Sequence, residues 1–221
     1  MKPSLDVFAL LARLQAQANP ANVAGMARYG INCNRTLGVP IPFLRALAKE
    51  TGKNHATAVR LWASGIHEAR ILATLVEEPD RVTPRQMDRW ARDLDSWDVC
   101  DQACQNLFRY QPCAFAKAAE WARAKPEFVR RAGFSLMAGL AAKAKSAPDS
   151  DFEAFFPLII ETATDERNMV KKAVNWALRG IGKRNPRLRA IAMRAAERIR
   201  RMDSPAARWI ASDALRELRT H

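Results

Sequence analysis

A large indole and a carboxylate lie one helical turn apart in the segment 96–110. Ser96 has the side chain of an N-cap residue, so we expect a helix to begin directly after it. The apolar positions that recur at helical spacing and mark the core face are Val99, Ala103 and Leu107. Trp97 and Asp101 share a different face of this helix. An aromatic ring beside an acid can attract and stabilise positive charge.

The role of Asp101 has two interpretations. In a protein that binds polyanions, an acid facing the ligand repels its backbone, so Asp101 would meet a cation or a positive charge that develops during a reaction. The alternative is a salt bridge to an arginine such as Arg70 or Arg109. Asp98 is the rival acid, but it points further from Trp97 and lies in the first turn, where acids stabilise the helix dipole.

A second indole lies among cations on the segment 168–183. At about 100° per residue, the positions that form the core face are Val170, Val174, Ala177 and Ile181. Lys172, Arg179 and Lys183 lie on the opposite side, with Trp176 among them. This arrangement suits an indole stacked on a sugar or base while cations hold phosphate. The alternative is a Trp176 side chain packed against a neighbouring repeat.

Arg131 is a third candidate, on the segment 127–140. The core positions of this segment are Val129, Ala132, Leu136 and Leu140. Arg131 points away from them and shares its face with Ser135 and Ala138. We therefore expect an exposed arginine whose small neighbours leave room for a ligand. An ordinary surface arginine is the alternative.

The positive charge is concentrated near the C-terminus. The 221 residues carry a formal net charge of +13. Residues 167–221 contain 15 Lys and Arg against 4 acids, a net +11, whereas residues 1–166 contain 21 against 19, a net +2. This asymmetry favours a polyanionic partner, and nucleic acid is the commonest large polyanion in a cytoplasm. A solvated helical face that serves solubility is the alternative.

The elements that position these residues are predicted to be helices. Apolar residues recur three and four positions apart, and Pro-containing breakers such as Asn19-Pro20, Thr83-Pro84 and Asn185-Pro186 separate the segments. We expect about a dozen helices of roughly 10 to 18 residues. The apolar run 155–160 has the composition of a short strand, but no other run could pair with it.

An internal repeat refines this all-α prediction. Val129-Arg130-Arg131-Ala132 and Val170-Lys171-Lys172-Ala173 lie 41 residues apart, and each precedes further helical positions. A period near forty is typical of HEAT-like two-helix repeats. We therefore predict a single domain over residues 1–221, an α-solenoid of HEAT-like two-helix repeats that forms a concave basic groove.

Several classes of protein lack support in the sequence. The longest apolar stretches fall well short of the ~18 residues that span a bilayer, and the N-terminus has no secretory signal pattern. Cys33, Cys100, Cys104 and Cys113 form no Cys-x-x-Cys, and the three histidines lie far from them in sequence, so we expect reduced thiols and no metal. Nucleotide-binding and serine-hydrolase motifs are also missing. We expect a cytoplasmic, nucleoid-associated protein with no cofactor, no membrane partner and no obligate protein partner.

Five strings, taken in order, resemble the bacterial DNA alkylation repair proteins, which are HEAT-repeat DNA glycosylases that excise 3-methyladenine and 7-alkylguanine. The resemblance covers residues 24–186. Its strings are Met26-Ala27-Arg28-Tyr29, Leu37-Gly38-Val39-Pro40, Ser96-Trp97-Asp98-Val99-Cys100-Asp101, Arg131-Ala132 and Lys172-Ala173-Val174-Asn175-Trp176-Ala177-Leu178-Arg179. The chain departs from the family pattern at Ser96, where some members have an aromatic residue, and at 30–34.

The resemblance implies that Asp101 is the catalytic carboxylate and that Trp97 and Trp176 flank the deoxyribose of the lesion. It places Arg131 on the phosphate next to the lesion and Tyr29 beside the same cleft. It also implies that the damaged base need not be flipped into a pocket. The residues expected to bind DNA are Arg28, Tyr29, Lys171, Lys172, Arg179, Lys183 and Arg184.

The sequence thus predicts a monofunctional DNA glycosylase that hydrolyses the N-glycosidic bond of cationic N3- and N7-alkylated purines. Its partner would be double-stranded DNA carrying alkylated bases. The first alternative is a non-catalytic HEAT-repeat protein that binds distorted or branched DNA. A second is a protein-binding scaffold whose C-terminal charge is incidental.

Overall fold

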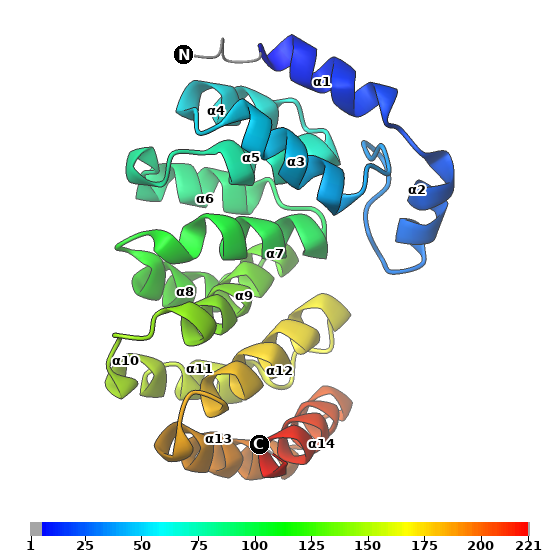
Figure 1. The fold of residues 1–221 in the computed structure, drawn as a ribbon. Helices are drawn as coiled ribbons and strands as arrows, with labels where there is room; N and C mark the ends of the chain where they lie inside the picture. The colour runs from blue at the N-terminus through cyan, green and yellow to red at the C-terminus, as the bar shows by residue number, and fades with distance from the viewer. Residues whose placement is uncertain (1–5, 221) are drawn as a thin grey trace. The chain divides into compact units, whose positions relative to one another are not determined.

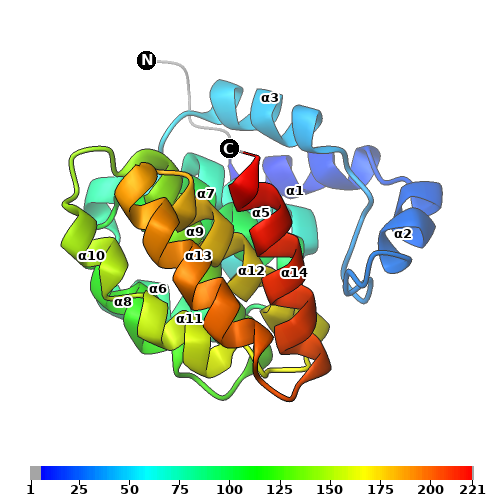
Figure 2. The same ribbon diagram turned by 90° about the horizontal axis from the view of Figure 1, so that it is seen from below.

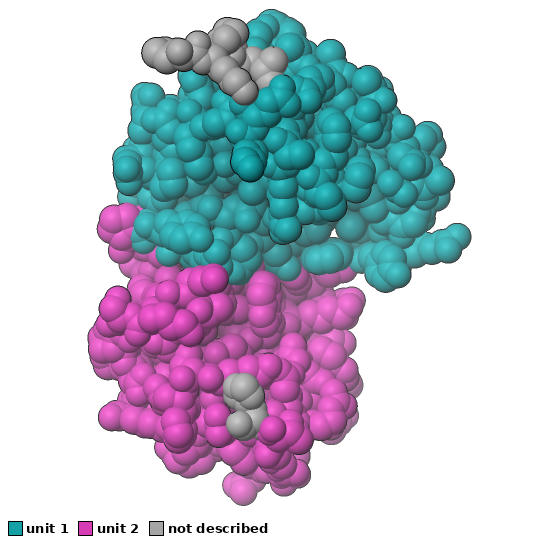
Figure 3. Space-filling view, in the orientation of Figure 1, with its two compact units in different colours: residues 1–111 teal, residues 112–221 magenta. Residues whose placement is uncertain are grey.

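The computed structural model of the protein describes residues 6–220. These residues form helices and connecting loops, with no β-strand among them, so the all-α prediction is confirmed. The chain divides into two compact units, one ending at Gln111 and the other beginning at Pro112. Figure 3 colours them teal and magenta. One domain over residues 1–221 stays a prediction.

In unit 1, α4 packs on α5, and α6 and α7 follow along the chain (Figure 1). Helix α5 packs on α3, α4 and α7, and the rings of Trp62 and Trp90 stack with centroids 4.1 Å apart to join α4 to α6. The elements are α1 (Val7–Ala16), α2 (Pro20–Ala27), α3 (Ile41–Thr51), α4 (His55–Ala63), α5 (His67–Val76), η1 (Pro79–Arg81), α6 (Pro84–Arg92), α7 (Trp97–Asn106) and η2 (Phe108–Tyr110).

Unit 2 stacks helix pairs in two rows (Figures 1 and 2). The first helices α8, α11 and α13 pack in sequence on one another, and the second helices α9, α12 and α14 do the same. The elements are α8 (Ala114–Ala122), α9 (Glu127–Lys143), α10 (Asp149–Glu153), α11 (Phe156–Thr162), α12 (Asn168–Gly182), α13 (Pro186–Arg200) and α14 (Pro205–Arg219). Arg131 and Trp176 are thus on second helices, as Trp97 and Asp101 are in unit 1.

The helix starts follow the breakers that the sequence contains. Proline occupies the first or second position of α2, α3, α6, α11, α13 and α14, where its missing N–H is not needed. The N-cap side chains that accept a backbone N–H of the first turn are Asn19, Asn54, Thr83, Asn185 and Ser204. Local sequence therefore fixes where seven of the fourteen described α-helices begin.

The predicted core faces are buried. The core residues proposed for α7, α9 and α12 are at most 9% exposed. The run 155–160 belongs mainly to α11, because its apolar side chains pack between α8 and α12 and no second strand is present among residues 6–220. Several helices are shorter than expected: α2 has 8 residues, α11 has 7 and α10 has 5. No helix within the described range is long and apolar enough to span a membrane.

Contacts between successive helix pairs recur at a fixed offset, as a repeat protein requires. In unit 2 the offset is 38 residues, in the bonds Arg131–Met169, Asn175–Asp213 and Arg179–Glu217. In unit 1 it is 31 residues, in the bonds Trp62–Asp93 and His67–Asp98. The predicted period near forty therefore holds for unit 2, while unit 1 uses shorter repeats.

Candidate functional site

Helix α7 begins where the sequence predicts, with Ser96 in an extended conformation as its N-cap. The Ser96 hydroxyl does not cap the helix, however; it donates to Asp98 Oδ1 at 2.7 Å. Asp98 Oδ1 also accepts the Val99 N–H at 3.0 Å. Asp98 thus serves the first turn, which leaves Trp97 and Asp101 on the neighbouring face.

Trp97, Asp101 and Tyr29 line one cavity of unit 1, with a volume of about 660 Å³. Trp97 Nε1 donates a hydrogen bond of 3.1 Å to the Tyr29 carbonyl oxygen, which ties the loop after α2 to the first turn of α7. The Tyr29 side chain is 74% exposed, whereas Trp97 and Asp101 are half-buried. Arg28, also exposed, is the C-cap of α2.

A histidine that the sequence did not single out lies in the same cavity. His67 Nε2 lies 2.8 Å from Asp98 Oδ2, and the His67 side chain is only 4% exposed. Burial opposes protonation of His67, but the hydrogen bond and charge of Asp98 outweigh it and raise the pKa of His67. Burial likewise opposes ionisation of Asp98, yet the His67 bond lowers the pKa of Asp98. The two residues form a hydrogen-bonded pair that lines the cavity, and the pair is ionic when His67 is protonated.

Glu68 organises the loop on the opposite wall of the cavity. Its buried carboxylate accepts the N–H groups of Leu37, Gly38 and Val39 at 2.9, 2.6 and 3.3 Å. Gly38 has φ +78, and a Cβ there would lie 2.3 Å from the Asn19 carbonyl oxygen. Glycine therefore allows the loop to approach the start of α2 closely.

The charges around this cavity contrast with those of the whole chain. The titratable side chains that line it are Tyr29, His67, Glu68, Asp98 and Asp101, and the lining residues, all from the described part of unit 1, include no Lys or Arg. Arg70 and Arg109, the alternative partners of Asp101, donate to the Asp93 carbonyl at 2.8 Å and to Gln105 at 3.1 Å. A cavity with aromatic rings and acids suits a planar cationic group.

Arg131 is buried rather than exposed, which corrects the expectation for α9. Its side chain is 5% exposed, and Nη1 donates to the Met169 carbonyl oxygen at 2.7 Å. Its small neighbours Ser135 and Ala138 are 0% and 3% exposed, so this face of α9 is a packing surface. Helical geometry showed correctly that Arg131 leaves the core stripe, but it could not show that α12 covers the guanidinium.

Trp176 lies in a hollow of unit 2 with a volume of about 340 Å³. It is half-buried, and the hollow is also lined by Arg179, Lys183 and Glu217. Glu217, on α14, forms ion pairs with both Arg179 and Lys183. Trp176 therefore lies beside cations, as predicted, but Arg179 and Lys183 are paired with Glu217 from the next repeat.

The other predicted cations of unit 2 have different surroundings. Lys172 is exposed, and Lys171 Nζ lies 5.2 Å from the ring centroid of Trp209. Arg184 donates to the carbonyl oxygens of Ala141 and Ala144, at the C-terminal end of α9, at 2.8 and 3.1 Å. Its guanidinium thus stabilises a helix end.

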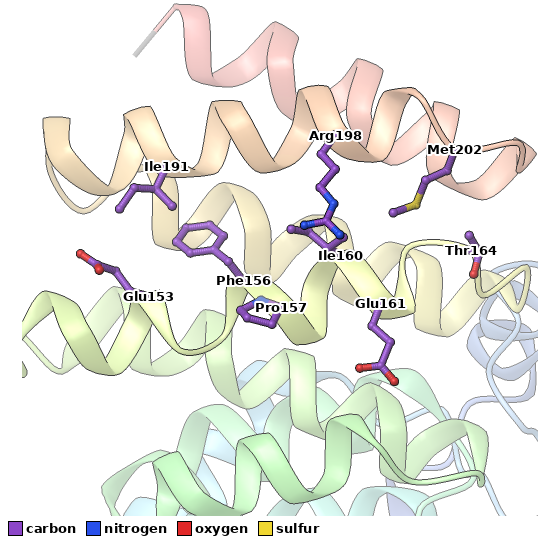
Figure 4. Close-up of a pocket in the computed structure, with 9 residues that line it drawn as sticks. All are labelled: Glu153, Phe156, Pro157, Ile160, Glu161, Thr164, Ile191, Arg198 and Met202. Atoms are coloured by element: carbon purple, nitrogen blue, oxygen red, sulfur yellow. The ribbon is translucent and has the colours of Figure 1, made fainter.

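A further pocket of unit 2, about 640 Å³ in volume, lies on the side of α11 and α13 (Figure 4). Apolar side chains such as Phe156, Ile160 and Ile191 line it, together with Glu161 and Arg198. None of the residues predicted to act on DNA belongs to its lining. Among residues 6–220, no group of three His, Cys, Asp or Glu side chains could hold a metal ion, and Cys100 and Cys104 are buried.

The predicted site residues thus fall into two groups. Unit 1 brings together Tyr29, Trp97 and Asp101, and unit 2 brings together Trp176, Arg179, Lys183 and Arg184. Arg131, Lys171 and Lys172 line neither cavity. A single groove that contains both groups stays a prediction.

The stacked helix pairs define a HEAT-like repeat protein, and the sequence identifies its family. Residues 10–218 match a family described as DNA alkylation repair enzyme. The chain therefore belongs to the DNA alkylation repair enzyme family. A search of curated proteins gives no match.

A solved structure described as "a new family of proteins related to the HEAT-like repeat DNA glycosylases with affinity for branched DNA structures" is similar over nearly the whole chain. The TM-score is 0.80 at 18% identity, covering 96% of this chain and 95% of that one. This likeness establishes the fold. An engineered protein and a designed armadillo repeat protein are similar at TM-scores of only 0.41 and 0.37, with 13% and 14% identity, and cover 80% and 79% of this chain and 91% of each of those.

Proposed function

We propose that the protein is a monofunctional DNA glycosylase that releases cationic N3- and N7-alkylated purines from duplex DNA. The observation that carries the proposal is the cavity of unit 1 that the Asp101 carboxylate lines together with the Trp97 indole and Tyr29. Membership of the DNA alkylation repair enzyme family and the excess of cations after residue 167 support it. Its setting would be the cytoplasm, in association with the nucleoid.

The chemistry requires stabilisation of positive charge rather than an acid. Alkylation at N3 or N7 makes the purine cationic, so the bond from C1′ to the base nitrogen breaks with its electron pair moving to the base. The base leaves neutral, and positive charge remains on the sugar. An ionised Asp101 would stabilise that charge and orient the water whose oxygen bonds to C1′, while the excess proton passes to solvent.

The indoles would contribute through their faces. An indole beside a cation contributes about 0.5–2 kcal/mol, most when the pair is desolvated. Trp97 is positioned for this role by its hydrogen bond to the Tyr29 carbonyl. The roles of Trp176 beside the deoxyribose and of Arg131 on a phosphate rest on the family resemblance. Tyr29, Arg28, Lys171, Lys172, Arg179 and Lys183 are the proposed DNA contacts.

The wild-type protein should release 7-methylguanine and 3-methyladenine from methylated duplex, because their positive charge has already weakened the glycosidic bond. It should leave neutral lesions such as uracil in place, since their glycosidic bond is not weakened by a positive charge and an ionised Asp101 cannot protonate a neutral leaving group. Chromatography of the freed bases measures both outcomes. Release of uracil at a rate similar to that of 7-methylguanine would contradict the proposal.

A second candidate is a non-catalytic protein that binds distorted or branched DNA. The observation that favours it is the structural likeness to a family described as having affinity for branched DNA. This candidate predicts tight, salt-dependent binding to a four-way junction and no release of any base by the wild type. The release assay therefore separates the two candidates.

A further inference from the structure

The hollow beside Trp176 contains more cations than its acid can neutralise. Lys145, Arg179, Lys183 and Arg184 line it, against the single carboxylate of Glu217. Glu217 Oε2 pairs with Arg179 and Oε1 with Lys183. Buried Arg179 Nε has no hydrogen-bond partner among the described residues. The charged side chains that line the hollow thus carry a net positive charge, which favours an anion.

The two cations are stabilised by their own helix, whereas the acid is not. Arg179 lies in the last turn of α12, and Lys183 is its C-cap. Cations are favourable at a helix C-terminus, because the helix dipole places negative charge there. Glu217 lies in the last turn of α14, which ends at Arg219, where the same dipole disfavours an acid. Removing Glu217 would therefore leave Arg179 and Lys183 in place.

Glu217 also differs from the neighbouring acid Asp213. Asp213 accepts a 2.6 Å hydrogen bond from the buried Asn175 amide, and it pairs with Arg216 of its own helix and, at 3.5 Å, with Arg179. The Glu217 carboxylate pairs with Arg179 of α12 and with Lys183, the C-cap of that helix. Asp213 is thus anchored between the repeats, and Glu217 can rotate away.

We propose that this hollow is a phosphodiester-binding site and that Glu217 is a displaceable counter-ion that occupies it until DNA binds. This inference rests on the proposed interaction with DNA, and it assigns to Glu217 a role that weakens binding to undamaged duplex. A DNA phosphate replaces the carboxylate on Arg179 and Lys183, and Glu217 moves to solvent.

The energetics permit the exchange. The side chains of Arg179, Lys183 and Glu217 are 28%, 39% and 27% exposed, and ion pairs that solvent reaches contribute little to stability. A phosphate on the same cations forms charge-assisted bonds, bidentate at the arginine, and its duplex releases condensed counter-ions. The need to displace Glu217 therefore lowers the affinity for DNA but does not prevent DNA from binding.

Glu217→Gln should bind an undamaged fluorescent duplex about 3- to 10-fold more tightly than the wild type at about 0.1 M salt, because the phosphate no longer competes with a carboxylate. The slope of log affinity against log salt should become more negative by up to about 0.9. Fluorescence anisotropy over a salt series measures both quantities.

Glu197→Gln is the matched control. It removes the same charge from a glutamate that pairs with Arg200 and Arg219 and is 33% exposed, outside the hollow. It should change affinity by less than about 2-fold, as a rim charge does. Equal effects of the two substitutions, or no gain from Glu217→Gln, would overturn the proposal.

Two further variants keep the test decisive. Glu217→Asp retains the charge on a shorter side chain, so it should give an intermediate affinity if Glu217→Gln fails to fold. In a Lys183→Gln, Arg179→Gln background, Glu217→Gln should produce no gain, and a retained gain would contradict the site. A wild type that binds no DNA even at low salt would instead refute the proposed function.

Discussion

Two carboxylates three residues apart on α7 have different tasks because they have different neighbours. The acceptors of Asp98 are used by Ser96, Val99 and His67, all within unit 1. Asp101 lies on the next face and lines the cavity with Trp97. The carboxylate of Asp98 is thus committed to the fold, and Asp101 is the carboxylate that we propose for catalysis.

The His67–Asp98 pair should make stability depend on pH. The pKa of His67 is raised in the folded state, so protonated His67 stabilises the fold. This stabilisation is fully present below the unfolded pKa of about 6.5 and is lost as pH rises through the folded pKa. The pKa of Asp98 is lowered in the folded state, so ionised Asp98 also stabilises the fold. This stabilisation is fully present above the unfolded pKa of about 3.9 and is lost as pH falls through the folded pKa. The pair therefore contributes most between these limits.

His67→Gln should consequently lower the free energy of unfolding by about 1–3 kcal/mol near pH 5.5, which is typical for a hydrogen bond to a charged group. The difference from the wild type should shrink as pH rises through the folded pKa of His67, because the imidazole then becomes neutral. Urea unfolding of both proteins across this range gives the comparison. A difference that grows with pH would refute the ion pair.

At the scale of elements, the loop before α3 holds α2 against the rest of unit 1. Glu68 accepts the N–H groups of residues 37–39, and Asn22 donates to the Gly38 carbonyl at 2.9 Å. The Asn19 N–H donates to the Leu37 carbonyl at 2.7 Å. These bonds position Tyr29, whose carbonyl receives Trp97 Nε1. Helix α2, which is remote from α7 in sequence, thereby shapes the cavity that Trp97 and Asp101 line.

Gly38→Ala should destabilise unit 1 by more than about 2 kcal/mol, because it adds a contact with the Asn19 carbonyl to the strain of a positive φ. Gly52→Ala is the control, since Gly52 has φ +76 and no atom within 4 Å of an added Cβ. It should cost only the backbone strain of φ +76 and ψ −173, about 1–3 kcal/mol, without the added contact. Thermal unfolding of the two variants tests this, and equal losses would contradict a close approach at Gly38.

The sequence predicted features that depend on one helix, and missed those that depend on two. Helical periodicity identified the buried stripes and placed Trp97 and Asp101 on one face, because both follow from 100° per residue. It did not find His67–Asp98, since the 31-residue offset of unit 1 leaves no visible repeat in the sequence. The burial of Arg131 was missed for the same reason: α12, not α9, covers it.

At the scale of the whole molecule, charge is segregated by function. The cavity of Asp101 contains no lining Lys or Arg, while residues 167–221 carry a net +11. Some of those cations have internal partners, as at Arg184 and Arg179. The formal charge therefore overstates the number of cations that meet DNA.

Salt dependence measures that number. Six cations, Arg28, Arg131, Lys171, Lys172, Arg179 and Lys183, are the proposed phosphate contacts, so log affinity should fall with log salt with a slope of about −5.4. A titration of undamaged duplex across a salt series provides the value. A slope near −10 would mean that most of the C-terminal cations take part, and a slope near zero would exclude a phosphate-binding surface.

The most direct test of the central claim is single-turnover release of 7-methylguanine, measured with duplex affinity, for wild type, Asp101→Asn and Asp80→Asn. Asp80 is an exposed acid in η1 outside the cavity. The account predicts that Asp101→Asn lowers the release rate at saturating protein by at least about 100-fold, or about 2.7 kcal/mol of transition-state stabilisation. Affinity should stay within about 2-fold, and Asp80→Asn should behave as the wild type. Unchanged release by Asp101→Asn would contradict the assignment of Asp101 as the catalytic carboxylate.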